Sequence, residues 1–125
     1  MSAPKHDQVL QALVDARGPM SANELWELLR EESQSVGLAT VYRALRRGVE
    51  EGRLVAVELQ AGSVRYEPAN LKHHHHFLCS RCERAFDLDG CVRQLERLLP
   101  AGFRMSGHEI LLFGNCADCA SEEGG

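Results

Sequence analysis

GLATVYRALRRGVEEGRLVAVELQAGSVRYE, residues 37–67, is the stretch that decides the fold of the first half of this chain. Its beginning repeats apolar residues at helical spacing, and Gly52 follows as the helix stop. The apolar stripe comprises Leu38, Val41, Leu45 and Val49. The rest alternates apolar and polar residues over 54–59, turns over 60–63 and returns over 64–67, which predicts a β-hairpin.

Two more helices are predicted before this stretch. Apolar residues recur at helical spacing within residues 5–16, and Gly18-Pro19 ends that helix. Ser21 and Glu24 match the Ser-x-x-Glu capping box that opens a second helix. The inner face of this second helix comprises Leu25, Leu28 and Leu29. Three helices followed by a hairpin predict an N-terminal winged helix-turn-helix, which we place over residues 1–68.

A different kind of sequence begins after residues 69–72, which we predict to be a hinge. A histidine-rich strand, a second strand around Phe86, a helix ended by Pro100 and a last strand over 103–113 are predicted in turn. The helix follows from the spacing of Val92, Leu95, Leu98 and Leu99. Residues 73–125 are therefore predicted to form a small C-terminal α/β domain, and the whole chain is predicted to be α+β.

Composition limits the compartment and the chemistry. The chain has 125 residues and a net charge of −4, and it contains no apolar run long enough to span a bilayer. No signal peptide is visible before the first predicted helix, so we expect a cytoplasmic protein with no membrane partner. Thiols stay reduced in that compartment, so the five cysteines point to metal or redox chemistry rather than disulfides.

Two Cys-x-x-Cys pairs predict a structural zinc site. Cys79 and Cys82 form one pair, and Cys116 and Cys119 form the other. Four thiolates complete a tetrahedral shell with no open position, which makes the site structural rather than catalytic. One pair alone would also suit thiol redox chemistry, but two pairs favour zinc. The remaining Cys91 is interpreted as a buried small hydrophobic residue at the start of a helix, with a redox or metal role as the alternative.

Four consecutive histidines, residues 73–76, precede the first cysteine pair. Side chains alternate faces along a strand, so His74 and His76 point one way while His73 and His75 point the other. Two pairs of imidazoles can therefore serve two separate metal sites. Imidazole suits zinc, iron, nickel and manganese, so the run does not name its metal. A solvent-exposed polar strand without ligands is the alternative, and the internal position argues against an expression tag.

Arginines are concentrated in one short region of an otherwise acidic chain. Any contact with DNA must come from this local basic patch, because the net charge is negative. A solvated helix face is the alternative interpretation. The region contains Arg43, Arg46, Arg47, Arg53 and Arg65.

Three motifs in this order resemble the ferric uptake regulator (Fur) superfamily of bacterial metal-sensing repressors. They are Gly37-Leu-Ala-Thr-Val-Tyr-Arg-Ala-Leu45, the histidine run with Phe-Leu-Cys-x-x-Cys, and His108 followed by Phe-Gly-Asn-Cys-Ala-Asp-Cys. The last motif is most similar to the zinc uptake regulator (Zur) branch. The resemblance implies a homodimer, held by a C-terminal dimerisation domain, whose two winged helices bind palindromic double-stranded operator DNA.

The resemblance also implies roles for individual residues. Tyr42 matches a position that contacts bases, and Arg43 one that contacts a phosphate or a base edge. The predicted DNA-contacting set is Thr40, Tyr42, Arg43, Arg46, Arg47 and Arg65. The regulatory metal at the hinge falls on Glu67, His74, His76 and Asp87. A second family site falls on His73, His75, Gln94 and His108, with Glu96 as a substitute for Gln94.

The chain departs from the family pattern in places that affect the sensed metal. Pro19 stands where iron and peroxide sensors carry a histidine, and Glu67-Pro68-Ala69 offers only a carboxylate where zinc sensors often place a cysteine. The N-terminus is short, so we expect part of the family's DNA contacts to be missing.

The predicted function is metal-dependent repression of metal uptake genes, without catalytic residues. Zinc is favoured as the regulatory metal beside the structural zinc, with iron or manganese as alternatives. A metal-binding hydrolase and a metal buffer are the alternatives from other classes.

Overall fold

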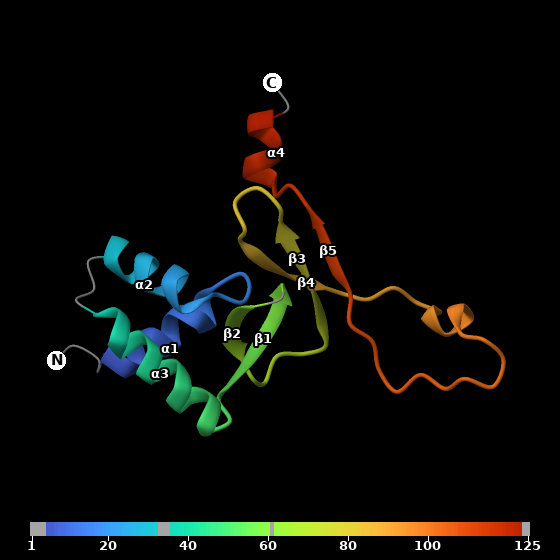
Figure 1. The fold of residues 1–125 in the computed structure, drawn as a ribbon, viewed down its shortest axis with the longest axis horizontal. Coiled ribbons are helices and arrows are strands. Elements are labelled where there is room, and N and C mark those ends of the chain that lie inside the picture. The colour runs from blue at the N-terminus through green and yellow to red at the C-terminus, as the bar shows by residue number, and fades with distance from the viewer. Residues whose placement is uncertain (1–4, 33–35, 61, 124–125) are drawn as a thin grey trace.

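The computed structural model describes residues 5–32, 36–60 and 62–123, and it has the predicted α+β fold class (Figure 1). Its elements, in chain order, are α1 (Lys5–Asp15), α2 (Ala22–Glu31), α3 (Leu38–Glu50), β1 (Leu54–Gln60), β2 (Ser63–Pro68), β3 (His74–Cys79), β4 (Ala85–Asp89), the 3-10 helix η1 (Leu95–Leu98), β5 (Leu111–Gly114) and α4 (Ala117–Glu123). The helices of the first half lie beside the β1–β2 hairpin, and the second sheet lies on the other side of that hairpin.

The three N-terminal helices enclose the main hydrophobic core. It is built from α1, α2, α3, the segment before α3 and the first residue of β1, and it comprises Val9, Leu10, Leu13, Ala22, Leu25, Leu29, Val36, Val41, Ala44, Leu45 and Leu54. The predicted capping box is present, since the hydroxyl of Ser21 accepts from the Glu24 N–H and the Glu24 carboxylate accepts from the Ser21 N–H. The predicted inner stripe of α3 is wrong at Val49, which is 39% exposed. Gly48 takes its place and packs against Leu54, because helical spacing carries the face of Val41 and Leu45 to position 48.

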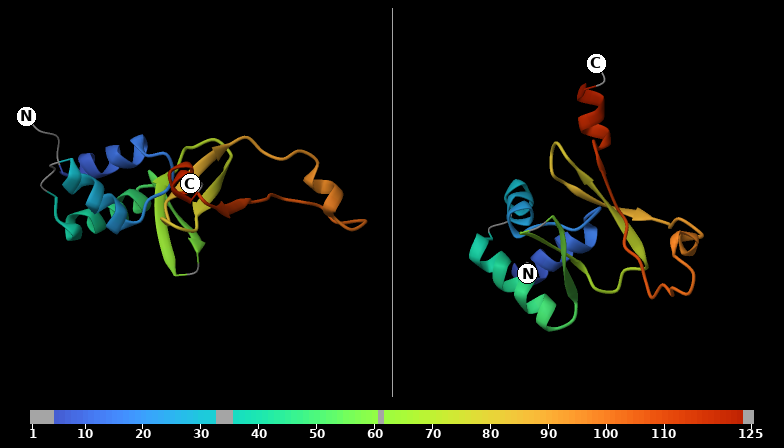
Figure 2. Two further views of the ribbon diagram at one scale, coloured as in Figure 1. Left: turned by 90° about the horizontal axis from the view of Figure 1, so that it is seen from above. Right: turned by 45° about the vertical axis from the view of Figure 1, so that its right-hand side comes forward.

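Two small sheets follow the helices (Figure 2). The hairpin β1–β2 is antiparallel, and an isolated bridge between Met20 and Tyr66 joins it to the segment before α2. The second sheet has the order β4-β3-β5, with β3 antiparallel to β4 and parallel to β5. The histidine strand is therefore central, and β5 is an edge strand.

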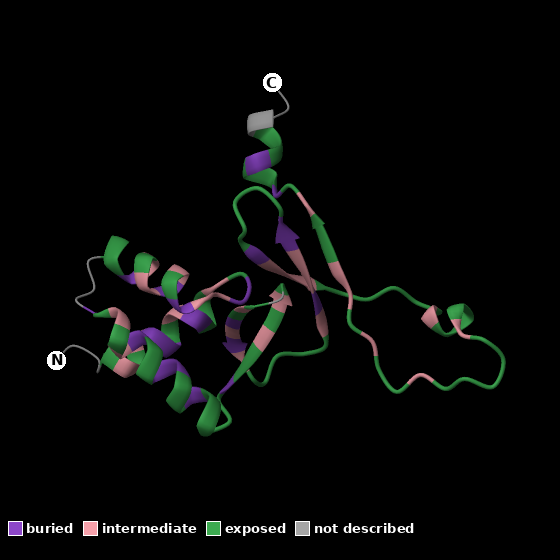
Figure 3. Ribbon diagram, viewed as in Figure 1, coloured by how far each residue is buried: buried purple, intermediate pink, exposed green. Residues whose placement is uncertain are grey.

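The segment between β4 and β5, residues 90–110, differs most from prediction. We call it the excursion, since it extends away from the rest of the chain in both views (Figures 1 and 2). The predicted helix shrinks to one turn, Leu95–Leu98, and the predicted strand over 103–113 is regular only from Leu111. Apolar residues at helical spacing need a surface to cover, but Leu98 is 81% exposed, and the excursion is coloured mostly as exposed in Figure 3. A short helix without packing is marginal in water, which explains the loss.

The loop between α1 and α2 packs closely against β4. Gly18 is buried, and a Cβ added there would lie 2.7 Å from the Cα of Phe86. Beside it, the Asp87 N–H donates to the Arg17 carbonyl at 2.8 Å. This contact joins the helical half of the chain to the sheet that carries the histidines.

Gly18→Ala is expected to lower the free energy of unfolding by about 1–3 kcal/mol, because backbone atoms of β4 cannot move aside for a methyl group. Urea unfolding of the zinc-loaded protein would measure the change. Gly107→Ala is the matched control, since an added Cβ there meets no atom within 4 Å. Equal unfolding free energies for the two variants would contradict the close contact.

Candidate metal centres

The two cysteine pairs converge at the end of the second sheet. Cys79 ends β3, Cys82 lies in the turn that follows, Cys116 precedes α4, and Cys119 lies within α4. The four sulfur atoms all lie within 4.8 Å of one another, and Cys82 Sγ is 3.8 Å from Cys116 Sγ. A tetrahedral shell with Zn–S bonds of about 2.3 Å has S···S edges of about 3.8 Å. The predicted residues are thus brought together at a spacing that fits zinc.

Backbone and side-chain donors surround these thiols. The N–H groups of Cys82 and Cys116 point at Cys79 Sγ and lower the pKa of that thiol to about 5. Burial raises the pKa of Cys119 to about 12 in the absence of a cation. Arg84 donates to Cys82 Sγ at 3.2 Å and to Asp118 at 3.1 Å. Four thiolates around Zn²⁺ carry a net negative charge, and the Arg84 guanidinium offsets part of it.

A second group collects ligands from three strands. Glu67 comes from β2, His74 and His76 from β3, and Asp87 from β4. Nε2 of His74 lies 3.2 Å from the Glu67 carboxylate, and Nε2 of His76 lies 3.3 Å from it. Both nitrogens lie 3.5 Å from Asp87 Oδ1. Metal–ligand bonds of about 2.0–2.1 Å give tetrahedral edges of about 3.3–3.4 Å, which matches this spacing.

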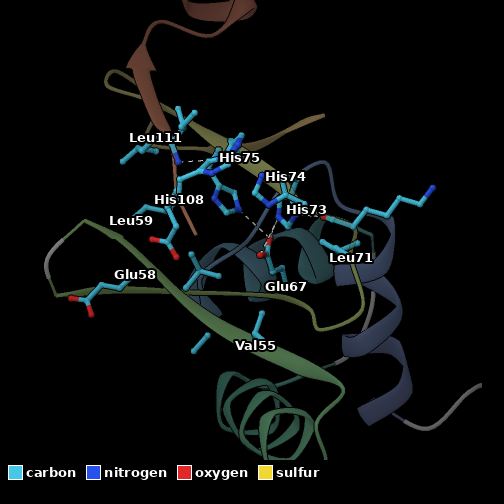
Figure 4. Close-up of a pocket in the computed structure, with 16 residues that line it drawn as sticks. Val55, Glu58, Leu59, Glu67, Leu71, His73, His74, His75, His108 and Leu111 are labelled. Carbon is cyan, nitrogen blue, oxygen red and sulfur yellow. Dashed lines mark hydrogen bonds and ion pairs between the residues drawn. The ribbon is translucent and has the colours of Figure 1, made fainter. Parts of the chain in front are cut away.

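Glu67, His74 and His76 line a cleft between the hairpin and the histidine strand, with a volume of about 690 Å³, which Figure 4 shows. The Nδ1–H of His74 donates to the Lys72 carbonyl at 2.7 Å, which leaves Nε2 with a free lone pair facing Glu67. Asp87 Oδ1 is buried and has no hydrogen-bond partner among the described residues. Lone pairs that face one another in this way fit a site for a cation.

Charges in this group shift two pKa values. Burial raises the pKa of Asp87, and the neighbouring Glu67 carboxylate raises it further. Burial lowers the pKa of His74, but the hydrogen bond to the Lys72 carbonyl and the two carboxylates outweigh it, so the pKa is raised overall. Neighbouring carboxylates contribute to both shifts, and protons or a divalent cation can neutralise their charge.

A third group lies on the opposite face of β3. His73, His75 and His108 meet there as predicted, but the fourth member is Cys91 and not Gln94. Gln94 instead caps η1 in the left-handed conformation, with a φ of 67°. Glu96, the alternative, is an exposed residue of η1 and also lies outside the group.

The interpretation of Cys91 as a buried residue starting a helix is wrong. Cys91 is exposed and precedes η1 by several residues. Its Sγ lies 2.8 Å from His108 Nε2 and 3.2 Å from His75 Nε2. The pairing of β3 with β4 explains why Cys91 is a member of this group. Asp89 pairs with His74, so Cys91, two residues later, lies beside the start of β3.

The exposed face of α3 carries most of the residues predicted to contact DNA. Tyr42 is 48% exposed and the three arginines of α3 are exposed, whereas Val41 and Leu45 face the core. Thr40 is half-buried and accepts a hydrogen bond from Arg43 at 3.1 Å. The three arginines are Arg43, Arg46 and Arg47.

Arg65 contradicts the prediction that it contacts DNA. Its side chain is 6% exposed and is paired with Glu24 of the capping box. It also donates to the Glu83 carbonyl, next to Cys82. Arg65 therefore connects α2 to the cysteine turn from inside the protein.

None of the helices in the described part of the chain has the length and apolar character needed to cross a bilayer.

The chain is similar to several known metal-uptake regulators. A ferric uptake regulation protein from Campylobacter jejuni is 31% identical over 96 residues, which cover 74% of this chain and 61% of the relative, so the chain spans less than two thirds of its length. The Vibrio cholerae ferric uptake regulator structure is 26% identical, with a TM-score of 0.69 and coverage of 93% of this chain and 92% of that one. A zinc uptake regulator complexed with zinc and DNA is 27% identical, with a TM-score of 0.55 and coverage of 98% and 85%. Residues 2–113 match the Ferric uptake regulator family. The chain belongs to this family of metal-responsive, DNA-binding transcription regulators, which are not enzymes.

Proposed function

We propose that this protein is a zinc-responsive, homodimeric repressor of metal uptake genes. One observation carries the proposal: Glu67, on the hairpin that follows α3, meets His74, His76 and Asp87 of the second sheet in one ligand group. A ligand group shared between the two sheets couples metal binding to the orientation of α3.

This ligand group controls how closely Glu67, on the hairpin, approaches the three ligands of the second sheet. Without a cation, Glu67 and Asp87 place two carboxylates in one partly buried site, where like charges repel. A divalent cation supplies the positive charge that removes this repulsion. Glu67 then stays against β3, and the hairpin and α3 keep one orientation. To raise the fraction of protein that can bind DNA from about 1% to 99%, the metal must bind the DNA-competent conformation about 5.5 kcal/mol more favourably than the other conformation.

Zinc is favoured by the number and spacing of the ligands. The group offers four donors among the described residues, at distances that fit a tetrahedron. Zinc is usually four-coordinate, whereas manganese prefers six ligands rich in oxygen. Pro19, at the position where the iron and peroxide sensors carry a histidine, is buried and has no donor to add. The likeness to a zinc uptake regulator bound to zinc and DNA supports the same choice.

The homodimer is supported by the apolar surface of the second half. Leu98, Phe103 and Phe113 are 81%, 64% and 71% exposed. They lie on the excursion and on β5, whose outer edge carries unpaired backbone groups that a second copy can cover. A two-fold dimer would present two copies of α3 to two half-sites of palindromic DNA.

The test is DNA binding by protein that keeps its tightly held zinc but has lost loosely held metal to a chelator. A DNA sequence that binds zinc-loaded protein is selected from random-sequence DNA, and the affinity of the protein for it is measured by fluorescence anisotropy. Zinc, manganese, iron(II) and nickel are added separately, and zinc is expected to raise the affinity most. If no metal changes the affinity, metal-responsive DNA binding is excluded, and a response to manganese or iron alone excludes zinc sensing.

Tyr42→Ala and Arg43→Ala are each expected to weaken binding to the selected DNA about tenfold or more, because a lost base contact costs about 1–3 kcal/mol. Arg104→Ala is the control, since it removes an exposed arginine of the excursion and leaves α3 intact. A metal buffer or a hydrolase would show no specific DNA binding to lose. Wild-type affinity in both α3 variants would contradict the assignment of α3 to DNA.

A further inference from the structure

We propose that His73, His75, Cys91 and His108 form a mixed imidazole–thiolate site for a thiophilic divalent cation such as zinc. The sulfur of Cys91 is the ligand that distinguishes this site from the set containing Gln94. The proposal concerns metal binding at the base of the excursion, and it does not depend on whether α3 binds DNA.

Geometry supports the ligand set. One donor atom from each of the four residues lies within 4.8 Å of all the others. Around a tetrahedral zinc, bonds of about 2.0 Å to nitrogen and 2.3 Å to sulfur give N···S edges of about 3.5 Å. Cys91 Sγ is hydrogen-bonded to His108 Nε2 at 2.8 Å and to His75 Nε2 at 3.2 Å. A cation bound between these atoms would replace the hydrogen bonds and increase both distances slightly.

Burial shows that the group is built into the fold. His75 is 4% exposed, and its ring lies edge-on to that of His73, with centroids 4.6 Å apart. The Ile110 N–H donates to Nδ1 of His75 at 3.2 Å. A neutral imidazole that binds metal through Nε2 carries its proton on Nδ1, so metal loading must release the Ile110 N–H, which lies just before β5.

The position of the ligands gives the site a structural effect. Cys91 and His108 lie near the two ends of the excursion, while His73 directly precedes β3 and His75 is its second residue (Figure 4 labels the three histidines). A cation held by all four would close the loop of residues 92–107 at its base. Closing a loop removes conformational freedom from the residues inside it, so metal loading orders the excursion.

The donor set also selects the metal. Thiolate and imidazole together suit zinc and cobalt(II), whereas manganese prefers carboxylate, carbonyl and water oxygen. This site is therefore unsuited to manganese, because its fourth ligand is the thiolate of Cys91 and not the amide oxygen of Gln94.

The experiment uses full-length protein with zinc retained at the four-cysteine site. Cobalt(II) is titrated in, and the near-ultraviolet sulfur-to-cobalt charge-transfer band is recorded. The Glu67 group contains no sulfur, so a band that grows while the four-cysteine zinc stays bound reports Cys91. Zinc is expected to abolish the band by competition, and manganese is expected to leave it in place.

Three variants test the ligands. Cys91→Ser is expected to lose the band and to weaken binding at this site by about tenfold or more, and His108→Ala to weaken it similarly. Gln94→Ala is the matched control and is expected to keep the wild-type band and affinity. A band that survives in Cys91→Ser, is absent from the wild type, or disappears in Gln94→Ala would overturn the proposal.

Alkylation gives a second readout in the unmutated protein. Zinc is expected to slow the reaction of Cys91 with iodoacetamide, as measured by mass spectrometry of the Cys91 peptide. Amide exchange across residues 92–107 is expected to slow in parallel. Equal alkylation rates with and without zinc would exclude Cys91 as a ligand.

Discussion

Replacing Cys82 by serine is expected to remove one tightly bound zinc per chain and to unfold the sheet formed by β3, β4 and β5. The second half has little other core: the buried cluster there consists of Cys79, Cys116 and Cys119, with Phe77 and Phe86 packed against it. Structural zinc sites contribute about 10–16 kcal/mol of apparent binding free energy in small domains. The loss exceeds what the remaining apolar contacts can replace.

Zinc content after gel filtration and urea unfolding would measure this effect. Cys91→Ser is the matched control, since it makes the same chemical change outside the four-cysteine group. After a chelator has removed loosely held metal, including metal at the proposed Cys91 site, it is expected to keep the tightly bound zinc and the wild-type fold. A Cys82→Ser protein with unchanged zinc content and unfolding midpoint would exclude the structural zinc.

Glu67→Gln is expected to abolish most of the zinc-induced gain in DNA affinity while leaving the tightly held zinc in place. The substitution keeps the size of the side chain but removes the charge that faces His74 and His76. The full gain in DNA affinity can reach about 100-fold for a switch between 1% and 99% competent protein, because apparent affinity scales with the competent fraction, and the variant should show less than about tenfold.

The measurement is fluorescence anisotropy on the selected DNA with and without added zinc. Glu58→Gln provides the control, since it makes the same change on β1 of the same hairpin, outside the ligand group. If Glu67→Gln kept the full response to zinc, this group would not be the sensor.

Local spacing explains why the helical half could be predicted from sequence. The capping box at Ser21 and the apolar repeats of the three helices depend only on residues within one or two turns. The division of the histidine run into two faces is equally local, because it follows from strand alternation. Only the family resemblance implies Glu67 and Asp87 as ligands. Both lie on other strands than the histidines, so the spacing of residues along the sequence does not show that they meet.

Arg65 and Cys91 show where sequence reasoning failed. Closeness in the chain groups Arg65 with the arginines of α3, yet Arg65 shares an inward strand face with Glu67, two residues later. Apolar spacing predicts that Cys91 starts a helix, but no packing surface supports that helix. Both errors concern contacts between distant segments, which local patterns do not encode.

The three donors His74, His76 and Asp87 stand on one antiparallel ladder, in which His76 and Asp87 are direct partners. Glu67 alone comes from the hairpin. In the proposed switch, Glu67 is therefore the last donor to arrive and the first to leave. Only this one metal ligand has to be exchanged for water when the DNA-binding half moves, although the movement also breaks the Arg17–Asp87 hydrogen bond and the packing of Gly18 on β4. The ladder keeps its three donors in register, so the speed of the response need not be limited by complete loss of the ion.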